Sequence, residues 1–113
     1  YIHVWDLARA HVMAVEGFER AFERAGNPHD NYLVINLGTG RGVTVRELVA
    51  AFEKVIGKPI KKTIGPRRPG DTAGSFCNAD TAKHLLEWQA ELSIEQGIRD
   101  ALRWGEVRDE ILK

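Results

Sequence analysis

Residues 32–37 read Tyr-Leu-Val-Ile-Asn-Leu and lead directly into residues 38–42, which read Gly-Thr-Gly-Arg-Gly. The first six residues form a nearly continuous apolar, β-rich run of strand length, and such a strand expects cover on both faces. The glycines predict a tight connection that requires positive φ. A strand that turns tightly into a helix indicates an α/β fold.

The helix after these glycines has clear start and stop signals. Thr44 and Glu47 have the spacing of a capping box, and Gly57 marks the end. The expected buried stripe is Val45, Leu48, Val49, Phe52 and Val55. The spacing of the glycines matches neither G-x-G-x-x-G nor the P-loop, so we interpret them as a turn rather than a phosphate site. The amides at the start of the helix would still attract a nearby anion.

The segment before residue 32 predicts a strand and one long helix. Residues 1–4 have the composition of a strand, and Asp6 can cap a helix that ends near Gly26. A loop through Asn31 follows. Apolar residues recur at intervals of three and four, which predicts a buried face of Ala8, Val12, Val15, Phe18 and Phe22.

After the central helix, residues 60–64 form a weak strand candidate. A further helix runs from Asn78 or Asp80 to about Trp88, and a second capping box from Ser93 to Gln96 opens the last helix. The expected inward residues are Ala82, Leu85, Leu86, Ile94, Ile98, Ala101 and Leu102, with Trp88 and Trp104 in the core. The predicted order is strand-helix-strand-helix-strand-helix-helix.

The composition fits one globular domain spanning residues 1–113. Sixteen basic and sixteen acidic residues give no net charge, which argues against nucleic acid as a partner. No apolar run is long enough to span a membrane. The single cysteine, Cys77, suits a reducing cytoplasm, and four histidines without ligand-like spacing argue against a metal site.

Residues 66–71 read Pro-Arg-Arg-Pro-Gly-Asp, which predicts a stiff, bent loop that presents charge. Arginine can donate a bidentate fork to phosphate and Asp71 can accept from hydroxyls, so the loop suits a phosphate beside a sugar. The alternative is a solvated turn whose charges serve solubility.

Four stretches together resemble the NAD-dependent UDP-glucose 4-epimerases of the extended short-chain dehydrogenase/reductase family. Residues 1–11 resemble Y-I-H-V-x-D-L-A-x-A-H, and residues 36–40 resemble N-L-G-T-G. Residues 66–71 resemble the R-R-x-G-D loop, and residues 78–88 resemble the helix after it. The resemblance covers essentially the whole chain and implies the C-terminal, substrate-binding part of an extended Rossmann-type enzyme.

In that family NAD accepts a hydride from the sugar and returns it to the other face, while UDP stays anchored. The resemblance implies that Arg68 contacts the diphosphate and Asp71 a ribose hydroxyl. Ser75 matches a position beside the sugar, where a bulky residue restricts the substrate to the plain hexose. A serine there implies that N-acetylated UDP-sugars are admitted.

The family's dinucleotide fingerprint and Tyr-x-x-x-Lys pair do not occur in these 113 residues. We therefore expect a separate N-terminal half to bind NAD, and we assign no catalytic, cofactor-binding or metal-binding residue to this chain. The resemblance also implies that the first helix and residues 32–37 complete the NAD-binding domain. Apolar surface left uncovered there predicts a homo-oligomer. The alternatives are a related nucleotide-sugar dehydratase or decarboxylase, a non-catalytic nucleotide- or anion-binding module, and a purely structural domain.

Overall fold

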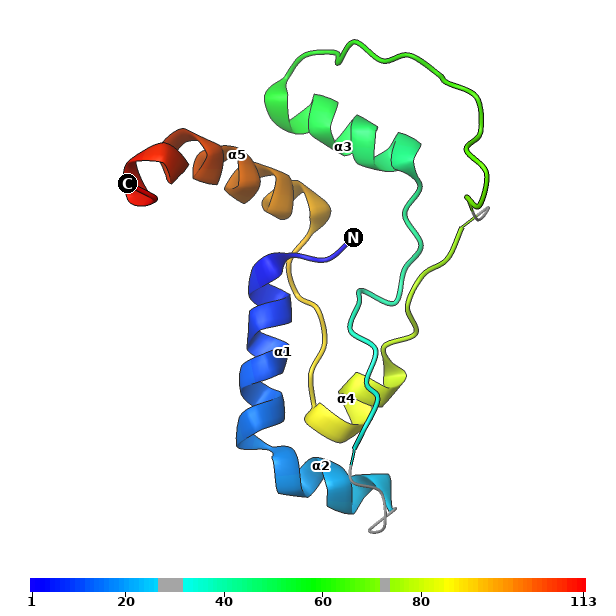
Figure 1. Cartoon of the computed structure of the whole chain (residues 1–113), viewed down its shortest axis with the longest axis vertical. Coiled ribbons are helices and arrows are strands. Elements are labelled where there is room, and N and C mark those ends of the chain that lie inside the picture. Colours follow the sequence, from blue (N-terminus) through cyan, green and yellow to red (C-terminus); the bar gives the residue numbers. More distant parts are fainter. Residues whose placement is uncertain (27–31, 72–73) are drawn as a thin grey trace.

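The computed structural model describes residues 1–26, 32–71 and 74–113 (Figure 1). The loop predicted through Asn31 lies outside the described residues. Within the described ranges the chain forms helices and no strand. The helices are α1 (Val4–Glu16), α2 (Phe18–Ala25), α3 (Val45–Ile56), α4 (Asp80–Leu86) and α5 (Ile94–Ile111).

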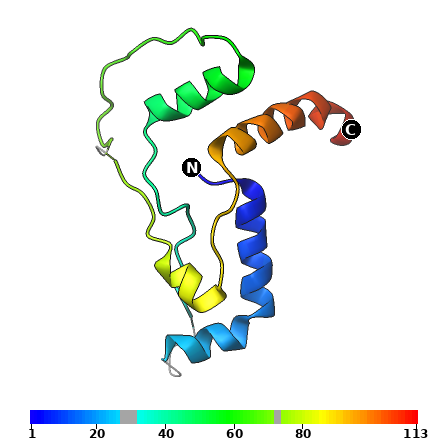
Figure 2. The ribbon, with the colours of Figure 1, turned by 180° about the vertical axis from the view of Figure 1, so that it is seen from behind.

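The helices pack as two groups. The lower group contains α1, α2 and α4, and the upper group contains α3 and α5 (Figure 1). The view from behind shows the same separation, with the N-terminus between the groups (Figure 2). The radius of gyration is 17.9 Å, whereas a compact chain of this length has a radius of about 13 Å. The molecule is therefore elongated.

The core lies in the lower group. Its buried residues are Ala10, Ala21, Ala82, Leu85, Leu86 and Trp88. The predicted inward residues of α4 are thus confirmed, and Trp88 is fully buried. The core prediction for Trp104 is wrong, because 46% of this residue is exposed on α5.

The first helix begins earlier than the sequence predicts. Residue 4 is already helical, and His3 rather than Asp6 is the N-cap because its side chain accepts from the amide of Trp5. The predicted strand at residues 1–4 is therefore wrong. The long helix is also divided at Gly17, where an added Cβ would lie 2.9 Å from the carbonyl oxygen of Met13. Gly26 ends α2 in the left-handed region, as predicted.

The predicted buried face of α1 and α2 is also wrong. Val12, Val15 and Phe18 are exposed, and Val15 retains 79% of its surface. The buried residues of these helices are instead Asp6, Ala10 and Ala21. The alanines are small enough for α4 and its flanking segments to approach closely. The larger apolar side chains lie on the opposite, uncovered side.

The side chains of residues 32–37 alternate between packed and exposed, as they do in a strand, although these residues are not part of a sheet. Leu33, Ile35 and Leu37 pack on the core, whereas Tyr32 and Val34 are exposed. A strand is defined by hydrogen bonds to a neighbouring strand, and the described residues provide no such neighbour. Residues 60–64 are likewise outside any sheet. The predicted alternation of strands and helices is therefore not confirmed.

The upper group has good helix ends and little burial. The capping box of Thr44 and Glu47 is confirmed in both directions, and Gly57 ends α3 with φ of +71°. None of the α3 residues, all of which the structure describes, is buried. Ser93 caps α5, which continues past Gly105 to residue 111. No helix of the described chain is long and apolar enough to cross a membrane.

Candidate functional site

The arginine loop contains a defined turn. The amide of Asp71 donates to the carbonyl of Arg68 at 3.2 Å, and Gly70 has φ of +86°. Proline at the second position and a positive-φ glycine at the third match a type II turn. The predicted bend in residues 66–71 is therefore confirmed.

Charged side chains on this turn pair weakly with each other. Arg68 Nε lies 3.3 Å from Asp71 Oδ2, and Arg67 Nη2 donates to the carbonyl oxygen of Asp71 at 2.7 Å. The Arg68 side chain is 85% exposed and that of Asp71 is 43% exposed. An ion pair this exposed stabilises by at most about 1 kcal/mol. An approaching anion could therefore take the guanidinium of Arg68 from its partner at little cost.

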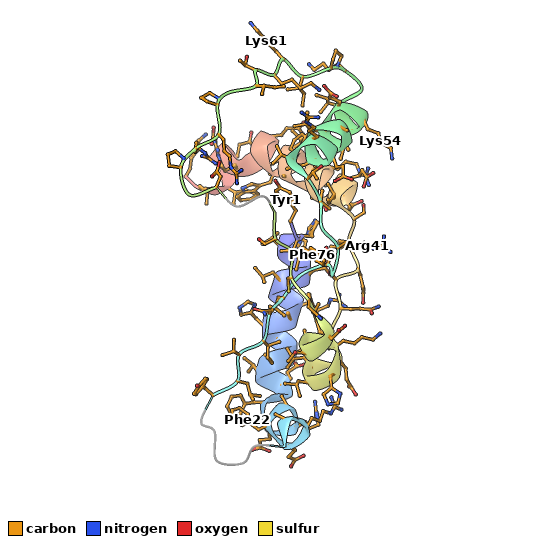
Figure 3. The ribbon with its side chains drawn as sticks, turned by 90° about the vertical axis from the view of Figure 1, so that its right-hand side faces the viewer. Tyr1, Phe22, Arg41, Lys54, Lys61 and Phe76 are labelled. Atoms are coloured by element: carbon orange, nitrogen blue, oxygen red, sulfur yellow. The ribbon has the colours of Figure 1, made fainter. Side chains whose placement is uncertain are left out.

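Ser75 lies in a different place, at a pocket of about 300 Å³. The walls of this pocket come from the N-terminal residues, the glycine-rich segment and residues 75–77. Its polar lining includes Ser75, Thr39 and Arg41. Figure 3 shows Tyr1, Phe76 and Arg41 near the middle of the molecule, between the two groups of helices. We call this cavity the Ser75 pocket.

The glycine-rich segment forms a wall of this pocket because its backbone lies close to residues 76 and 77. A Cβ at residue 38 would lie 2.7 Å from the Cβ of Cys77, and one at residue 42 would lie 3.3 Å from Phe76. Only Gly40 of the three glycines has positive φ, at +70°. The turn prediction is therefore right for Gly40, whereas at the other two glycines a second segment, residues 76–77, passes close to the backbone and leaves least room at Gly38.

A second pocket of about 720 Å³ shares Thr39 and Arg41 with the first. Its remaining walls come from α4, the segment after it and the start of α5, with Lys83 as a further cation. Sequence reasoning missed Arg41. The signal was present, since a cation follows the glycine turn, but the glycine spacing alone was compared with phosphate motifs. Thr39 and Arg41 are thus polar groups that a ligand in either cavity could reach.

The structure brings Arg68 and Asp71 together but places neither in the lining of the two pockets just described. Residues 72–73, which connect the turn to Ser75, lie outside the described part of the chain. The relation of the turn to the Ser75 pocket therefore stays a prediction.

A buried carboxylate holds one wall of the larger pocket in place. Asp6 Oδ2 accepts from the amides of Glu91 and Leu92 at 3.1 and 2.9 Å, and Oδ1 accepts from Arg9 at 3.0 Å. Burial opposes ionisation, yet the two amides and Arg9 together keep the pKa of the Asp6 carboxyl below its ordinary value. Trp88 Nε1 also donates to the backbone oxygen of Asp6 at 3.0 Å.

The histidines at positions 3 and 11 and the single cysteine have structural roles. His3 is buried, and its Nε2 lies 3.0 Å from Oδ2 of Asp100. These two residues are 97 positions apart, so no local pattern reveals the pair. His11 is exposed and bonds the carbonyl of Leu7. Cys77 is half-buried and donates to the carbonyl of Asn78.

Comparison with known proteins identifies the class of the relatives. No family model matches the sequence. The homologues are UDP-glucose 4-epimerases, which match at 40 to 44% identity over 92% of the chain. The resemblance stated from the sequence is therefore confirmed.

Among these relatives is the UDP-glucose 4-epimerase of Bifidobacterium longum, which is 40% identical over 104 residues. The epimerase of Bacillus subtilis and epimerase 4 of Oryza sativa are each 44% identical over 104 residues. The chain spans about 28% of the length of the two bacterial relatives and 26% of the rice relative.

The fold comparison agrees with the sequence comparison. A crystal structure of the Bifidobacterium longum epimerase in complex with NAD+ and UDP matches with a TM-score of 0.78 and 40% identity. The match covers 94% of this chain and 29% of that one. The described helices therefore have the arrangement of a part of that enzyme, which supports the family fold.

Proposed function

We propose that this chain is the UDP-anchoring, C-terminal part of an NAD-dependent UDP-glucose 4-epimerase, which interconverts UDP-glucose and UDP-galactose. The observation that carries the proposal is the match over 94% of the chain to an epimerase crystallised with NAD+ and UDP. The exposed, weakly paired guanidinium of Arg68 on a defined turn supports it. Residues 1–113 then act as one substrate-binding unit.

The proposed roles follow from charge and geometry. Arg68 releases Asp71 and donates to the diphosphate, and Asp71 then accepts from a ribose hydroxyl. Holding the nucleotide end fixed leaves the sugar end free to present either face, which is what epimerisation requires. NAD, when bound, supplies the hydride acceptor. These 113 residues contain no dinucleotide fingerprint, so we assign NAD binding to a separate N-terminal half.

The uncovered surface supports such a partner. The accessible surface is 9369 Å², whereas a compact protein of 12.7 kDa exposes about 6,200 Å². The excess of about 3,000 Å² is in the range of permanent interfaces. Much of it is apolar, on the outer side of α1 and α2 and on the unpaired segment 32–37. We propose that the N-terminal half packs here and that residues 32–37 extend its sheet.

The same surface would drive self-association of the chain on its own. Sedimentation should show oligomers at high concentration, and a monomer there would contradict this part of the proposal. We also propose a cytoplasmic location, which a single free cysteine supports.

Anchoring of UDP is tested by calorimetry on the chain assembled with an epimerase N-terminal half. Arg68→Ala should weaken UDP binding about tenfold to a hundredfold, because a charge-assisted hydrogen bond is lost. The matched control is Arg67→Ala, which removes an adjacent guanidinium of the same loop and should have a smaller effect. Equal losses in the two variants would contradict a specific role for Arg68.

Turnover separates the remaining alternatives. Interconversion of UDP-glucose and UDP-galactose supports the epimerase, whereas a 4-keto-6-deoxy or decarboxylated product identifies a dehydratase or decarboxylase. UDP binding without turnover leaves a nucleotide-binding module, and no UDP binding at all contradicts the proposal.

Acceptance of N-acetylated sugars is a further part of the proposal. Ser75 lines a pocket with Thr39, and the resemblance implies that the sugar lies beside this serine. The assembled enzyme should turn over both UDP-glucose and UDP-N-acetylglucosamine. Ser75→Tyr should abolish only the second activity, and equal loss of both would contradict the specificity role.

A further inference from the structure

His3 uses both ring nitrogens in one fixed arrangement. The residue is 7% exposed, and its Nδ1 accepts from the amide of Trp5 at 3.0 Å. Because Nδ1 accepts, the proton of the neutral ring is on Nε2, which lies 3.0 Å from Asp100 Oδ2. The ring therefore caps α1 with one nitrogen and donates to α5 with the other.

The Asp100 end of this link is held as firmly. Gln96 donates from Nε2 to both carboxylate oxygens of Asp100 at 3.0 Å. The backbone amide of Gln96 in turn donates to Ser93 Oγ, the N-cap of α5. The hydrogen bond from Gln96, followed by that from His3, lowers the pKa of Asp100. The first turn of α1 is thus joined to the first turns of α5.

The ring of His3 lies beside the backbone of α5. An added Cβ at Gly97 would lie 3.4 Å from His3 Cδ2, so the ring passes close to the α5 backbone. His3 and Gly97 also line a largely apolar cavity of about 640 Å³ between the start of α1, α3 and α5. Trp5, Phe52 and Trp104 contribute to its lining, and its titratable residues are Tyr1, His3 and Asp100.

The two residues before His3 line the Ser75 pocket. Tyr1 and Ile2 line that cavity together with the glycine-rich segment, and Ile2 also packs on the core. The position of Tyr1 and Ile2 depends on the position of His3, the next residue in the chain. The bonds of His3 to α1 and to α5 hold it in place.

We propose that His3 is a positioning residue, which fixes the Tyr1–Ile2 wall of the Ser75 pocket through its bonds to Trp5 and Asp100. The inference rests on the proposed function, since that pocket is where the resemblance implies the sugar lies. His3 would then affect handling of the sugar and leave the UDP contacts of Arg68 and Asp71 unchanged.

Two isosteric substitutions separate the bonds. In His3→Asn the side-chain oxygen can replace Nδ1 as the cap but is too short for Asp100. In His3→Gln the amide nitrogen can replace Nε2 toward Asp100, and the cap is lost. The control is Arg24→Ala, which removes hydrogen bonds to Leu85 and Glu87 at the distant contact of α2 and α4. Each variant is measured in the chain assembled with the N-terminal half.

We expect both His3 variants to lower kcat/KM for UDP-glucose about fivefold to tenfold, with the Kd of UDP within about twofold of the unsubstituted enzyme. Arg24→Ala should lower thermal stability without this split. A fall in kcat/KM no larger than that of Arg24→Ala, or an equal loss of UDP affinity, would overturn the positioning role.

Failure of the proposed function itself gives a different result, because the unsubstituted enzyme would then neither bind UDP nor turn over UDP-glucose. In that case NMR chemical shifts still test the inference. Altered chemical shifts of Thr39 and Ser75, which line the pocket, in both His3 variants but not in Arg24→Ala support it. Unchanged chemical shifts at these residues contradict it.

Discussion

The lower and upper groups of helices have similar shares of apolar residues and very different burial. In the lower group α1, α2 and α4 enclose a core with Trp88 at its centre. In the upper group α3 packs along α5, yet all of α3 keeps some exposure and Ile98 is the buried residue of α5. An amphipathic helix buries its apolar stripe only where a second surface reaches it.

The polar contacts follow the same division. Asp6, Arg9 and Arg24 on α1 and α2 bond the segments on both sides of Trp88. Between the upper helices the contact of this kind is an exposed ion pair of Lys54 and Glu95. We therefore expect the stability of the chain to reside in the lower group. The upper group and the arginine loop would depend on the proposed N-terminal half and adapt to it.

The largest expected effect is at the centre of the lower group. Trp88→Ala should destabilise the chain by about 3–5 kcal/mol, because it leaves a large cavity and removes the bond from Nε1 to Asp6. Trp104→Ala, in the upper group, should cost less than about 1 kcal/mol because half of this side chain is already in water. Urea denaturation of both variants measures the difference. Similar losses of stability in the two variants would show that the two groups contribute equally to the free energy of unfolding.

The next effect concerns the buried carboxylate of the lower group. Asp6→Asn should cost about 2–3 kcal/mol at neutral pH, because Arg9 then faces an uncharged amide and the backbone amides of Glu91 and Leu92 both lose their ionised acceptor. Glu91→Gln removes only the negative charge from the exposed contact with Arg9 and should cost under about 1 kcal/mol. Thermal melting of the two variants compares these contributions.

We also expect Asp6→Asn to change how the stability of the chain depends on pH. The pKa of Asp6 is lower in the folded chain than the ordinary value, so its ionised form stabilises the fold. This contribution is fully present above about pH 4, the ordinary value for aspartate, and is lost as the pH falls through the folded pKa. Asp6→Asn should therefore melt with less pH dependence in the acidic range than the unsubstituted chain. An identical acid profile would contradict this role.

The ends of helices could be predicted from the sequence better than the sides on which the helices are buried. The capping box of Thr44, the ends at Gly26 and Gly57 and the inward residues of α4 each depend on a few neighbouring residues, and the structure has them in place. The capping box predicted at Ser93 is formed in one direction, since the side chain of Gln96 bonds Asp100 instead. The buried face of α1 was wrong because apolar periodicity does not distinguish a surface that this chain covers from one it leaves open. Small alanines and one buried carboxylate form the actual contact.

In the candidate site, too, only the features set by neighbouring residues could be predicted from the sequence. The turn at Arg68 could be predicted because proline and glycine have intrinsic conformational preferences. The contact of Gly38 with Cys77 and the link of His3 to Asp100 join residues far apart in sequence. Such contacts are set by tertiary packing, and no spacing rule in a single sequence reveals them.

A moderate effect is expected at the start of α3. Thr44→Ala removes the acceptor for the Glu47 amide and half of the capping box, and should cost about 1 kcal/mol. Thr44→Ser keeps the hydroxyl and should cost only a few tenths of that amount. Hydrogen exchange of the first α3 amides gives the local measurement. If the upper group depends on its caps more than on a core, α3 should open without global unfolding. Loss of structure in both groups at the same time would instead show that they unfold as one cooperative unit.

The smallest expected effect is a gain in the upper group. Gly105 is in the interior of α5 and an added Cβ would meet nothing within 4 Å. Gly105→Ala should stabilise the chain by about 0.5–1 kcal/mol, because alanine loses less backbone entropy in a helix. Gly97→Ala in the same helix should gain less, since its Cβ would lie 3.4 Å from the His3 ring. Equal gains in thermal stability at the two positions would mean that His3 does not constrain the start of α5. A loss at Gly105 would mean that the outer half of this helix already packs against another surface, such as a second copy of the chain.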